Sequence, residues 1–311
     1  MTPGDLLLFA LQLPLVVLLA PALNGAIKAW KAFWQNRQGP GLLQPWWDIA
    51  KYLARESVVS EHASWVYRWA PAVYLGALLT AACLAPTLAI FSPLGRYGDA
   101  IAVVGLLALA RFALALAALD TASNFGGMGT SRELMFAALV EPALLLGVFA
   151  VAAPLGTTNL EALAAGTPVD MAHVLAFGCL FIVAIAETGR IPVDNPDTHL
   201  ELTMAHEGMI LEYSGRPLGL LLLGGHVKQL VMLSLLAAFF LPWGSARDLT
   251  APALALGLVA YVLKVTVLAA ALGLTESLNA KLRVFKVPEL LGTASVLGFL
   301  AVVAGVTGGA H

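Results

Sequence analysis

Charged residues are scarce in this sequence, and so are cysteines. Only 12 % of its 311 residues are charged and 59 % are hydrophobic, whereas roughly 25 % charged residues is usual for a soluble domain. This composition excludes an ordinary soluble protein. Cys83 and Cys179 lie in apolar runs without metal-ligand spacing, so both are expected to be buried. The net charge of −2 provides no basic surface for nucleic acid.

Familiar catalytic and cofactor motifs are also missing. We find no nucleophile elbow, zinc motif, Walker loop or dinucleotide fingerprint. The glycine group NFGGMG (124–129) follows an apolar run rather than a strand, which argues against phosphate binding. His199 and His206 lie seven residues apart, and no further His or Cys completes a metal site. We therefore expect no metal or redox cofactor bound directly by this chain.

Long apolar runs occupy most of the sequence instead. About 20 such residues cross about 30 Å of hydrocarbon, and backbone groups in lipid must pair within their own segment, which favours helices. The first 20 residues contain no Lys or Arg, so they resemble a retained helix more than a signal peptide. We predict an all-α integral membrane protein with one domain over 1–311 and about eight transmembrane helices. The expected spans lie near 4–24, 70–91, 98–119, 135–155, 170–188, 218–242, 251–274 and 289–306.

Basic residues between the spans predict an orientation. Twelve lie in the odd-numbered loops, whereas the even-numbered loops hold only Arg96 and Arg247. Since cytoplasmic loops carry the excess of Lys and Arg, the odd loops are expected to be cytoplasmic and both termini to lie outside. The twelve residues are Lys28, Lys31, Arg37, Lys51, Arg55, Arg68, Arg132, Arg190, Arg216, Lys281, Arg283 and Lys286.

An amphipathic segment lies in the first of these loops. In LLQPWWDIAKYLARESV (42–58), Trp46, Ile49 and Leu53 fall on one helical face, and Lys51 and Arg55 fall on the other. Such a helix is typical of the headgroup layer. A simple cytoplasmic connector remains the alternative.

Several ionisable residues fall inside or at the edge of predicted spans. Each intramembrane charge costs about 2.5–3.5 kcal/mol on insertion scales, so it is expected to face the bundle interior and a partner. Proton relays are built from such residues, but structural ion pairs are the alternative, particularly for the basic ones. The residues are Arg111, Glu141, Glu187, Lys228, Lys264 and Glu276.

The stretch ETGRIPVDNPDTHLELTMAHEGMILEYSGR (187–216) concentrates six of the 19 acids of the protein in 30 residues. It begins at Glu187 on the membrane edge and continues into the expected cytoplasmic loop. We interpret it as a path of carboxylates leading from the cytoplasm into the bilayer, although a solvated surface loop would have a similar composition. The acids are Glu187, Asp194, Asp197, Glu201, Glu207 and Glu212.

Three motifs resemble a known family. QNRQGPGLLQPWWDIAKYL (35–53), the patch 132–142 and the acidic stretch are similar to subunit 1 of respiratory complex I, which in bacteria is the H-type subunit. Quinone-reducing members typically read R-x-G-P-N-R-x-G-P in the first loop, where this sequence has the shorter NRQGPG (36–41). It more closely resembles the subunit 4 type of formate hydrogenlyase and the component C type of hydrogenase 4, of the group 4 membrane-bound [NiFe] hydrogenases.

The resemblance implies a non-catalytic membrane anchor and energy-coupling subunit in a bacterial or archaeal cytoplasmic membrane. Expected partners are the hydrogenase small and large subunits, iron–sulfur subunits and antiporter-like membrane subunits. The iron–sulfur clusters and the nickel–iron centre would lie in those partners. Carried over by position or chemistry, a proton pathway would comprise Glu141, Glu187, Arg190, Asp194, Asp197, Glu201, Glu207, Glu212, Lys228 and Lys264. Docking of the peripheral arm would involve Arg37, Gly39, Pro40 and Arg216.

Two other functions remain open at this point. One is a quinone-binding membrane subunit of an NADH or ferredoxin:quinone oxidoreductase, with quinone as the ligand. The other is a freestanding proton-coupled transporter, against which the absence of internal repeats and the large one-sided loops argue.

Overall fold

The computed structural model describes residues 3–61, 63–166, 170–194 and 205–308, and within them the regular elements are helices. The helices in chain order are α1 (Pro3–Trp34), α2 (Gln44–Leu53), α3 (Trp65–Leu84), η1 (Gly95–Tyr97), α4 (Ala100–Asp120), α5 (Asn124–Ala152), η2 (Ala153–Leu155), α6 (Leu160–Ala164), α7 (Met171–Glu187), α8 (His206–Ile210), α9 (Gly215–Phe240), α10 (Ala251–Leu278), η3 (Val284–Lys286) and α11 (Val287–Gly308). The all-helical class is confirmed.

Several helices begin at side chains that accept hydrogen bonds from free backbone N–H groups. Asp99 Oδ1 accepts from Ile101 N at 2.8 Å at the start of α4, and Asp170 Oδ1 accepts from His173 N at 2.8 Å at the start of α7. Ser64 caps α3 in the same way, since its Oγ accepts from Val66 N at 3.1 Å. These caps satisfy backbone donors that apolar surroundings would leave unpaired.

Six helices of the described chain are long and apolar enough to cross a membrane, namely α1, α4, α5, α9, α10 and the helix that includes α11. The protein is therefore a multi-pass membrane protein. The second predicted span corresponds to α3, which is less apolar at its start. The fifth predicted span corresponds to α7, which is shorter and has only 17 residues. Two boundaries differ most from prediction. α1 continues to Trp34, whereas the predicted span ends at residue 24, and α5 begins at Asn124, whereas the predicted span begins at residue 135.

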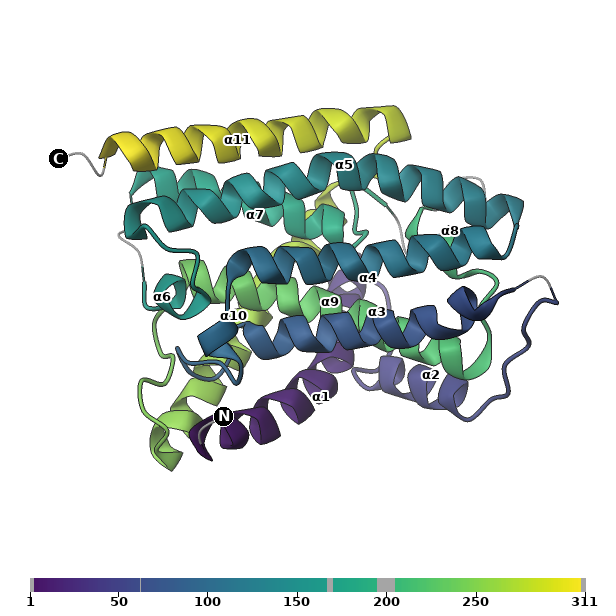
Figure 1. The fold of residues 1–311 in the computed structure, drawn as a ribbon, viewed down its shortest axis with the longest axis horizontal. Coiled ribbons are helices and arrows are strands. Elements are labelled where there is room, and N and C mark those ends of the chain that lie inside the picture. Colours follow the sequence, from purple (N-terminus) through teal and green to yellow (C-terminus); the bar gives the residue numbers. More distant parts are fainter. Residues whose placement is uncertain (1–2, 62, 167–169, 195–204, 309–311) are drawn as a thin grey trace.

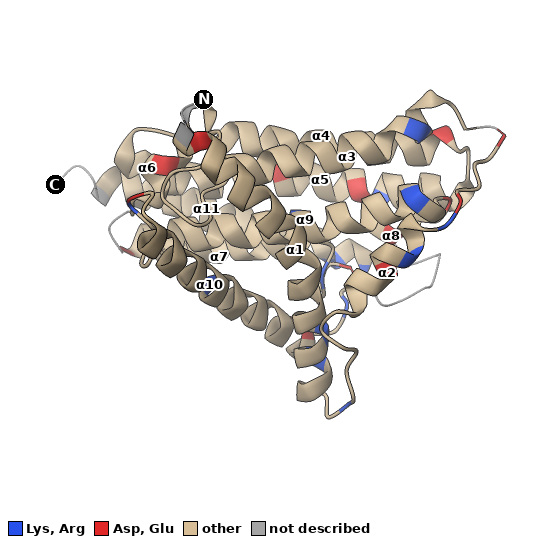
Figure 2. Cartoon of the chain, turned by 90° about the horizontal axis from the view of Figure 1, so that it is seen from below, with Lys and Arg blue, Asp and Glu red and all other residues tan. Residues whose placement is uncertain are grey.

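The long helices run side by side, with α11, α5 and α7 together on one side and α4 and α3 following (Figure 1). α9 lies inside the bundle, and its residues 227–239 are all buried. α1 and α10 are tilted away from the others and converge at one end (Figure 2). Lys and Arg gather mainly at the end that holds α2, α8 and the start of α3 (Figure 2).

The predicted amphipathic segment forms α2. Ile49 is buried, whereas Trp47 and Lys51 on other faces are exposed. α2 packs on the starting turns of α9, where Gly219 lies against the side chain of Leu53. Trp46 Nε1 donates to the carbonyl oxygen of Leu18 in α1 at 3.2 Å. This helix is therefore attached to the bundle at the basic end.

Candidate functional site: a buried ionic network

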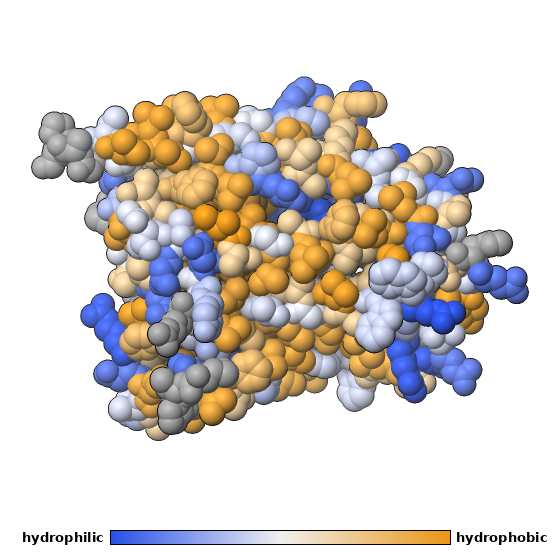
Figure 3. Space-filling view, in the orientation of Figure 1, coloured by the Kyte–Doolittle hydropathy of each residue, from blue (hydrophilic) through white to orange (hydrophobic). Residues whose placement is uncertain are grey.

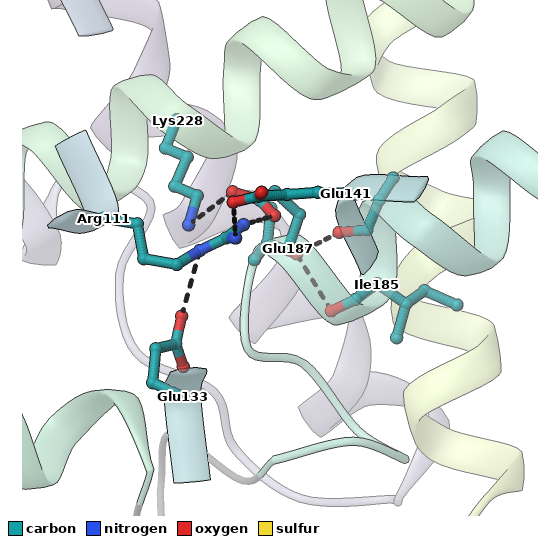
Figure 4. Close-up of polar contacts among 8 residues, drawn as sticks. Arg111, Glu133, Glu141, Ile185, Glu187 and Lys228 are labelled. Carbon is teal, nitrogen blue, oxygen red and sulfur yellow. Dashed lines mark hydrogen bonds and ion pairs between the residues drawn. The ribbon is translucent and has the colours of Figure 1, made fainter. Parts of the chain in front are cut away.

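Arg111 in the middle of α4 lies at the centre of a cluster of charges (Figure 4). Its Nη1 donates to Glu141 Oε1 at 2.7 Å, and its Nη2 donates to Glu187 Oε2. Its Nε lies 3.7 Å from Glu133 Oε1. The planar fork of a guanidinium can serve several carboxylates at once, which a lysine could not do in this geometry. One arginine therefore joins carboxylates from α5 and α7.

Glu187 is the innermost member of this cluster, and its side chain has 0 % exposure. It ends α7 and receives a second cation from α9, since Lys228 Nζ lies 2.9 Å from its Oε1. Removing such charges from water is costly and is tolerated only with close partners. The cluster holds three carboxylates and two cations, so it carries one excess negative charge when all are ionised.

A second cluster surrounds Glu276 near the end of α10. Lys31 of α1 approaches its Oε2 at 2.6 Å, and Arg190 Nη1 donates to its Oε1 at 3.2 Å. Arg190 Nη2 also donates to Gln229 Oε1 at 2.7 Å, and Asn24 Nδ2 donates to the same oxygen at 3.5 Å. These contacts join α1, α9, α10 and the segment after α7.

The two clusters adjoin along the chain. Glu187 and Arg190 are three residues apart, and their partners Lys228 and Gln229 are consecutive in α9. The two clusters therefore lie next to each other along α9, and together they are called the ionic network below.

A cavity of about 150 Å³ opens beside this network. Arg190 and Gln229 of the second cluster line it, together with Tyr74, His206 and Glu207. Polar walls and this volume allow several water molecules. The cavity thus supplies a space large enough for water between the α8 segment and the buried charges.

The α8 segment is held at the cavity by Asp194. Asp194 Oδ2 accepts from Ala205 N at 3.1 Å and from His206 N at 3.4 Å, and Lys281 Nζ lies 2.7 Å from its Oδ1. Burial lowers the pKa of His206 below its usual value, and the positive charge of Lys228 acts in the same direction. The nearby carboxylates oppose this lowering of the pKa without reversing it. His206 therefore lines the cavity as a neutral imidazole near pH 7.

At the other side of the network, Glu141 reaches the surface. A groove of about 380 Å³ between α4 and α5 contains Arg111 and Glu141 among small or apolar residues, including Gly105 and Ala137. The Glu141 side chain is 41 % exposed, although the sequence predicts that it faces the bundle interior. Figure 3 shows hydrophilic atoms within the hydrophobic middle of this face, over α4 and α5. A carboxylate at this depth is costly against lipid.

The remaining predicted residues lie elsewhere. Lys264 does not join the network, because its Nζ donates to Ser245 Oγ at 3.0 Å in the segment that follows α9. Glu212 is exposed, and its backbone oxygen accepts from Tyr67 Oη at 2.7 Å. The docking candidates Arg37, Gly39, Pro40 and Arg216 are all exposed. Asp197 and Glu201 lie outside the described residues.

Sequence reasoning leaves several members of the network out of the predicted pathway. Arg111 and Glu276 stand out in the sequence only as charges within spans, and hydropathy alone gives them no partner. Glu133 escapes notice because the helix that carries it begins 11 residues before the predicted span. Among the described residues, no group of His, Cys, Asp and Glu has the arrangement of a metal site.

Known proteins are similar to this chain over most of its length. The family model described as NADH dehydrogenase matches residues 6–306. Formate hydrogenlyase subunit 4 of Escherichia coli is 37 % identical over 91 % of this chain and 93 % of its own length. Hydrogenase-4 component C of the same organism is 36 % identical over 98 % of both chains.

More distant relatives extend the comparison to quinone reductases. NADH-quinone oxidoreductase subunit 8 of Rhodothermus marinus is 30 % identical over 66 % of this chain and 62 % of its own. A chain of an archaeal membrane-bound sulfane sulfur reductase shares the fold, with a TM-score of 0.82 at 21 % identity, covering 97 % of this chain and 99 % of that one. This chain belongs to the NADH dehydrogenase family of complex I-like membrane subunits.

Proposed function

We propose that this protein is the membrane anchor and proton-coupling subunit of a group 4 [NiFe] hydrogenase of the formate hydrogenlyase type, in a bacterial or archaeal cytoplasmic membrane. Formate hydrogenlyase subunit 4 is 37 % identical to this chain, whereas the Rhodothermus quinone oxidoreductase subunit is 30 % identical. The observation that carries the proposal is the shared contact of Glu187 and Glu141 with Arg111.

In this proposal, a proton enters from the cavity beside His206 and Glu207. The cluster around Arg111 accepts it, because three carboxylates face two cations there. Redox changes in a docked iron–sulfur subunit alter the field at the α8 segment and so change the proton affinity of the cluster. The proton leaves at Glu141, in the groove between α4 and α5.

We assign one partner subunit to each end of this proposed proton path. We assign Arg37, Gly39, Pro40 and Arg216, which are all exposed, to docking of the peripheral arm on the cytoplasmic side. The half-exposed Glu141 is accommodated by an antiporter-like membrane subunit that covers the groove, because lipid would not stabilise the carboxylate. The eight-span arrangement with outward termini, with α3 and α7 as the additional spans, is part of the same proposal.

Quinone binding is not favoured by the cavity. Its volume of about 150 Å³ is below the range of ligand pockets, which begins at about 300 Å³. We therefore assign the space to water, and place the iron–sulfur clusters and the nickel–iron centre in the partner subunits.

The proposal is tested by Glu141→Gln in the assembled complex. Gln keeps the shape of the side chain but cannot carry a proton as a carboxylate does, so hydrogen evolution from reduced methyl viologen should persist in uncoupled vesicles. Acidification of inverted membrane vesicles, followed with a pH-sensitive dye, should fall at least fivefold. Glu289→Gln, at an exposed position in the first turn of α11, is the matched control and should behave as the wild type. Normal acidification by Glu141→Gln would remove Glu141 from the path.

A further inference from the structure

A vestibule of about 840 Å³ opens away from the ionic network. Its lining includes Asp5 in the first turn of α1, Glu161 of α6 and several residues of the segment between α3 and α4. The start of α1 and α6 lie at the end of the bundle opposite α2 and α8 (Figure 1 and Figure 2). The volume is within the range of ligand pockets, about 300–1,000 Å³. This acidic vestibule can therefore hold a molecule larger than water.

Two walls of the vestibule are fixed by backbone hydrogen bonds. In the wall formed by α6, Leu160 N donates to Gly98 O at 2.8 Å, one residue before Glu161. In the wall that follows α9, Ala246 N donates to Leu88 O at 3.1 Å, and the next two residues of this wall are charged. The charged side chains of the vestibule thus extend from backbone that is attached to neighbouring segments.

Glu161 and Ser92 form a polar corner of the vestibule. Glu161 Oε1 accepts from Ser92 N at 3.1 Å, and it lies so close to Gly95 that a Cβ there would overlap this oxygen. Ser92 is 3 % exposed, and among the described residues its Oγ has no hydrogen-bond partner. Buried hydroxyl groups normally have one. This hydroxyl is therefore available to a polar ligand that enters the vestibule.

The vestibule carries charges of both signs. Arg247 and Asp248 line it next to each other, together with the acids Asp5 and Glu161. Both Arg247 and Asp248 are exposed, and the described part of the chain offers neither of them an ion pair. Three acids against one arginine disfavour an anion. Within the described residues, no group of His, Cys, Asp and Glu is arranged as a metal site. An extended ligand with both charges fits this lining better than a single ion.

Exposed apolar side chains border the same space. Phe91, Tyr97 and Leu249 line the vestibule, and all three are exposed. Aromatic side chains are typical of the level at which lipid headgroups meet hydrocarbon, and the apolar helix α1 begins here. A ligand at this level meets charged groups and apolar side chains at once. This combination matches a phospholipid, which has a charged headgroup and apolar chains.

We propose that the vestibule binds the headgroup of a zwitterionic phospholipid with a primary amine, of the phosphatidylethanolamine class. Arg247 donates to the phosphate, because guanidinium groups bind phosphate oxygens well. Glu161 accepts from the ammonium, which has three donors, and Asp248 adds negative charge beside it. Ser92 Oγ forms a hydrogen bond to the headgroup in the corner next to Glu161. The acyl chains lie along the apolar border.

The same groups explain why the amine is read. A choline headgroup has no N–H donor, so it could not form a hydrogen bond to Glu161. A glycerol headgroup leaves the phosphate charge uncompensated among three acids. The inference goes beyond the proposed function, because it requires only that this end of the bundle meets lipid headgroups.

The experiment adds dihexanoyl phosphatidylethanolamine to the purified complex in detergent and follows amide hydrogen exchange over residues 91–98. Exchange should slow severalfold, because a bound headgroup restrains the segment that carries Ser92. The phosphatidylcholine and the phosphatidylglycerol with the same chains should have less than about a third of this effect at equal concentration. Magnesium chloride alone should have no effect.

Three variants test the assigned groups. Glu161→Gln removes the charge but keeps an oxygen that can accept from Ser92 N, and Arg247→Gln removes the phosphate donor. Ser92→Ala removes a hydroxyl that has no partner in the described structure, so folding should not suffer. Each variant should raise the phosphatidylethanolamine concentration for half-maximal slowing at least about fivefold. Glu289→Gln, at an exposed position of α11, is the matched control and should respond as the wild type.

Several results would overturn the inference. Equal slowing by phosphatidylcholine would show that the amine is not recognised, and stronger slowing by phosphatidylglycerol would show an anion site. Equal slowing by magnesium chloride would show a cation site. A wild-type response of both Glu161→Gln and Ser92→Ala would also overturn it, and these two variants decide the question if Arg247→Gln does not assemble. None of these results affects the acidification test of Glu141→Gln, so the proposed function stands or falls separately.

Discussion

At the scale of single residues, Arg111 determines how the charges of this bundle are arranged. Its three nitrogens each face a different carboxylate, two from α5 and one from α7. Lys228 reaches only Glu187. Loss of Arg111 would therefore leave Glu133 and Glu141 without this cation. Glu187 would keep only one of its two cations, Lys228. The residue is therefore a structural joint between α4, α5 and α7.

We expect Arg111→Gln to destabilise the protein by about 3–5 kcal/mol, because breaking a buried ion pair leaves uncompensated charge. Thermal unfolding of the purified complex in detergent measures the change. The double variant Arg111→Gln/Glu187→Gln should recover part of the loss, since it removes the most deeply buried orphaned carboxylate. Arg283→Gln, at an exposed position, is the control. An unfolding midpoint equal to that of the wild type for Arg111→Gln would contradict the role of the arginine.

Part of this cluster can be anticipated from the sequence. Arg111, Glu141, Glu187 and Lys228 stand out because each interrupts an apolar run, and charges in such runs need partners. Which residues become partners depends on the angles and depths at which α4, α5, α7 and α9 pack, and local sequence does not specify these. Lys264 shows the consequence, because its sequence environment resembles that of Lys228 but its helix carries it to a different polar group.

At the scale of elements, the unexpected feature is the early start of α5. The glycine group 124–129 forms its first turns instead of a loop. Gly129 packs directly against the backbone of α8, so that a Cβ there would lie 2.8 Å from Ala205 O and 3.0 Å from Gly208 C. The glycines thus allow α8 to lie close to α5, with His206 and Glu207 at the cavity. Composition alone cannot distinguish such packing glycines from loop glycines.

Gly129→Ala should therefore displace α8, because a backbone contact of this kind cannot be relieved by a side-chain rotation. We expect faster amide hydrogen exchange over 205–211 and a severalfold loss of vesicle acidification. Gly127→Ala on the same helix meets no atom within 4 Å. This control should stabilise the helix by up to about 1 kcal/mol. Equal exchange over 205–211 in the two variants would show that the glycine contact does not position α8.

At the scale of the whole molecule, the two ends of the bundle differ in chemistry. One end carries most of the Lys and Arg, together with α2 and α8 (Figure 2). It is also where the segment before α9 meets the first loop: the rings of Tyr67 and Tyr213 stack with their centres 4.0 Å apart, and Ser214 Oγ accepts from Val58 N at 2.9 Å. The other end carries η1, α6 and the acidic vestibule, the cavity of about 840 Å³ lined by Asp5, Glu161 and Asp248. The charge bias that predicts the orientation is therefore a property of one end of the folded bundle.

This bias predicts which end faces the cytoplasm, and two cysteine variants test it. Cys83 and Cys179 are buried, so engineered cysteines are the reactive ones. Phe285 in η3 lies between Arg283 and Lys286 and is 89 % exposed, and Tyr97 in η1 is 75 % exposed. A membrane-impermeant maleimide added to spheroplasts should label Tyr97→Cys and spare Phe285→Cys, and inverted vesicles should give the reverse pattern, because excess Lys and Arg stay in the cytoplasm. Labelling of Phe285→Cys from outside would reverse the orientation, and would place the acidic vestibule on the side assigned here to the peripheral arm.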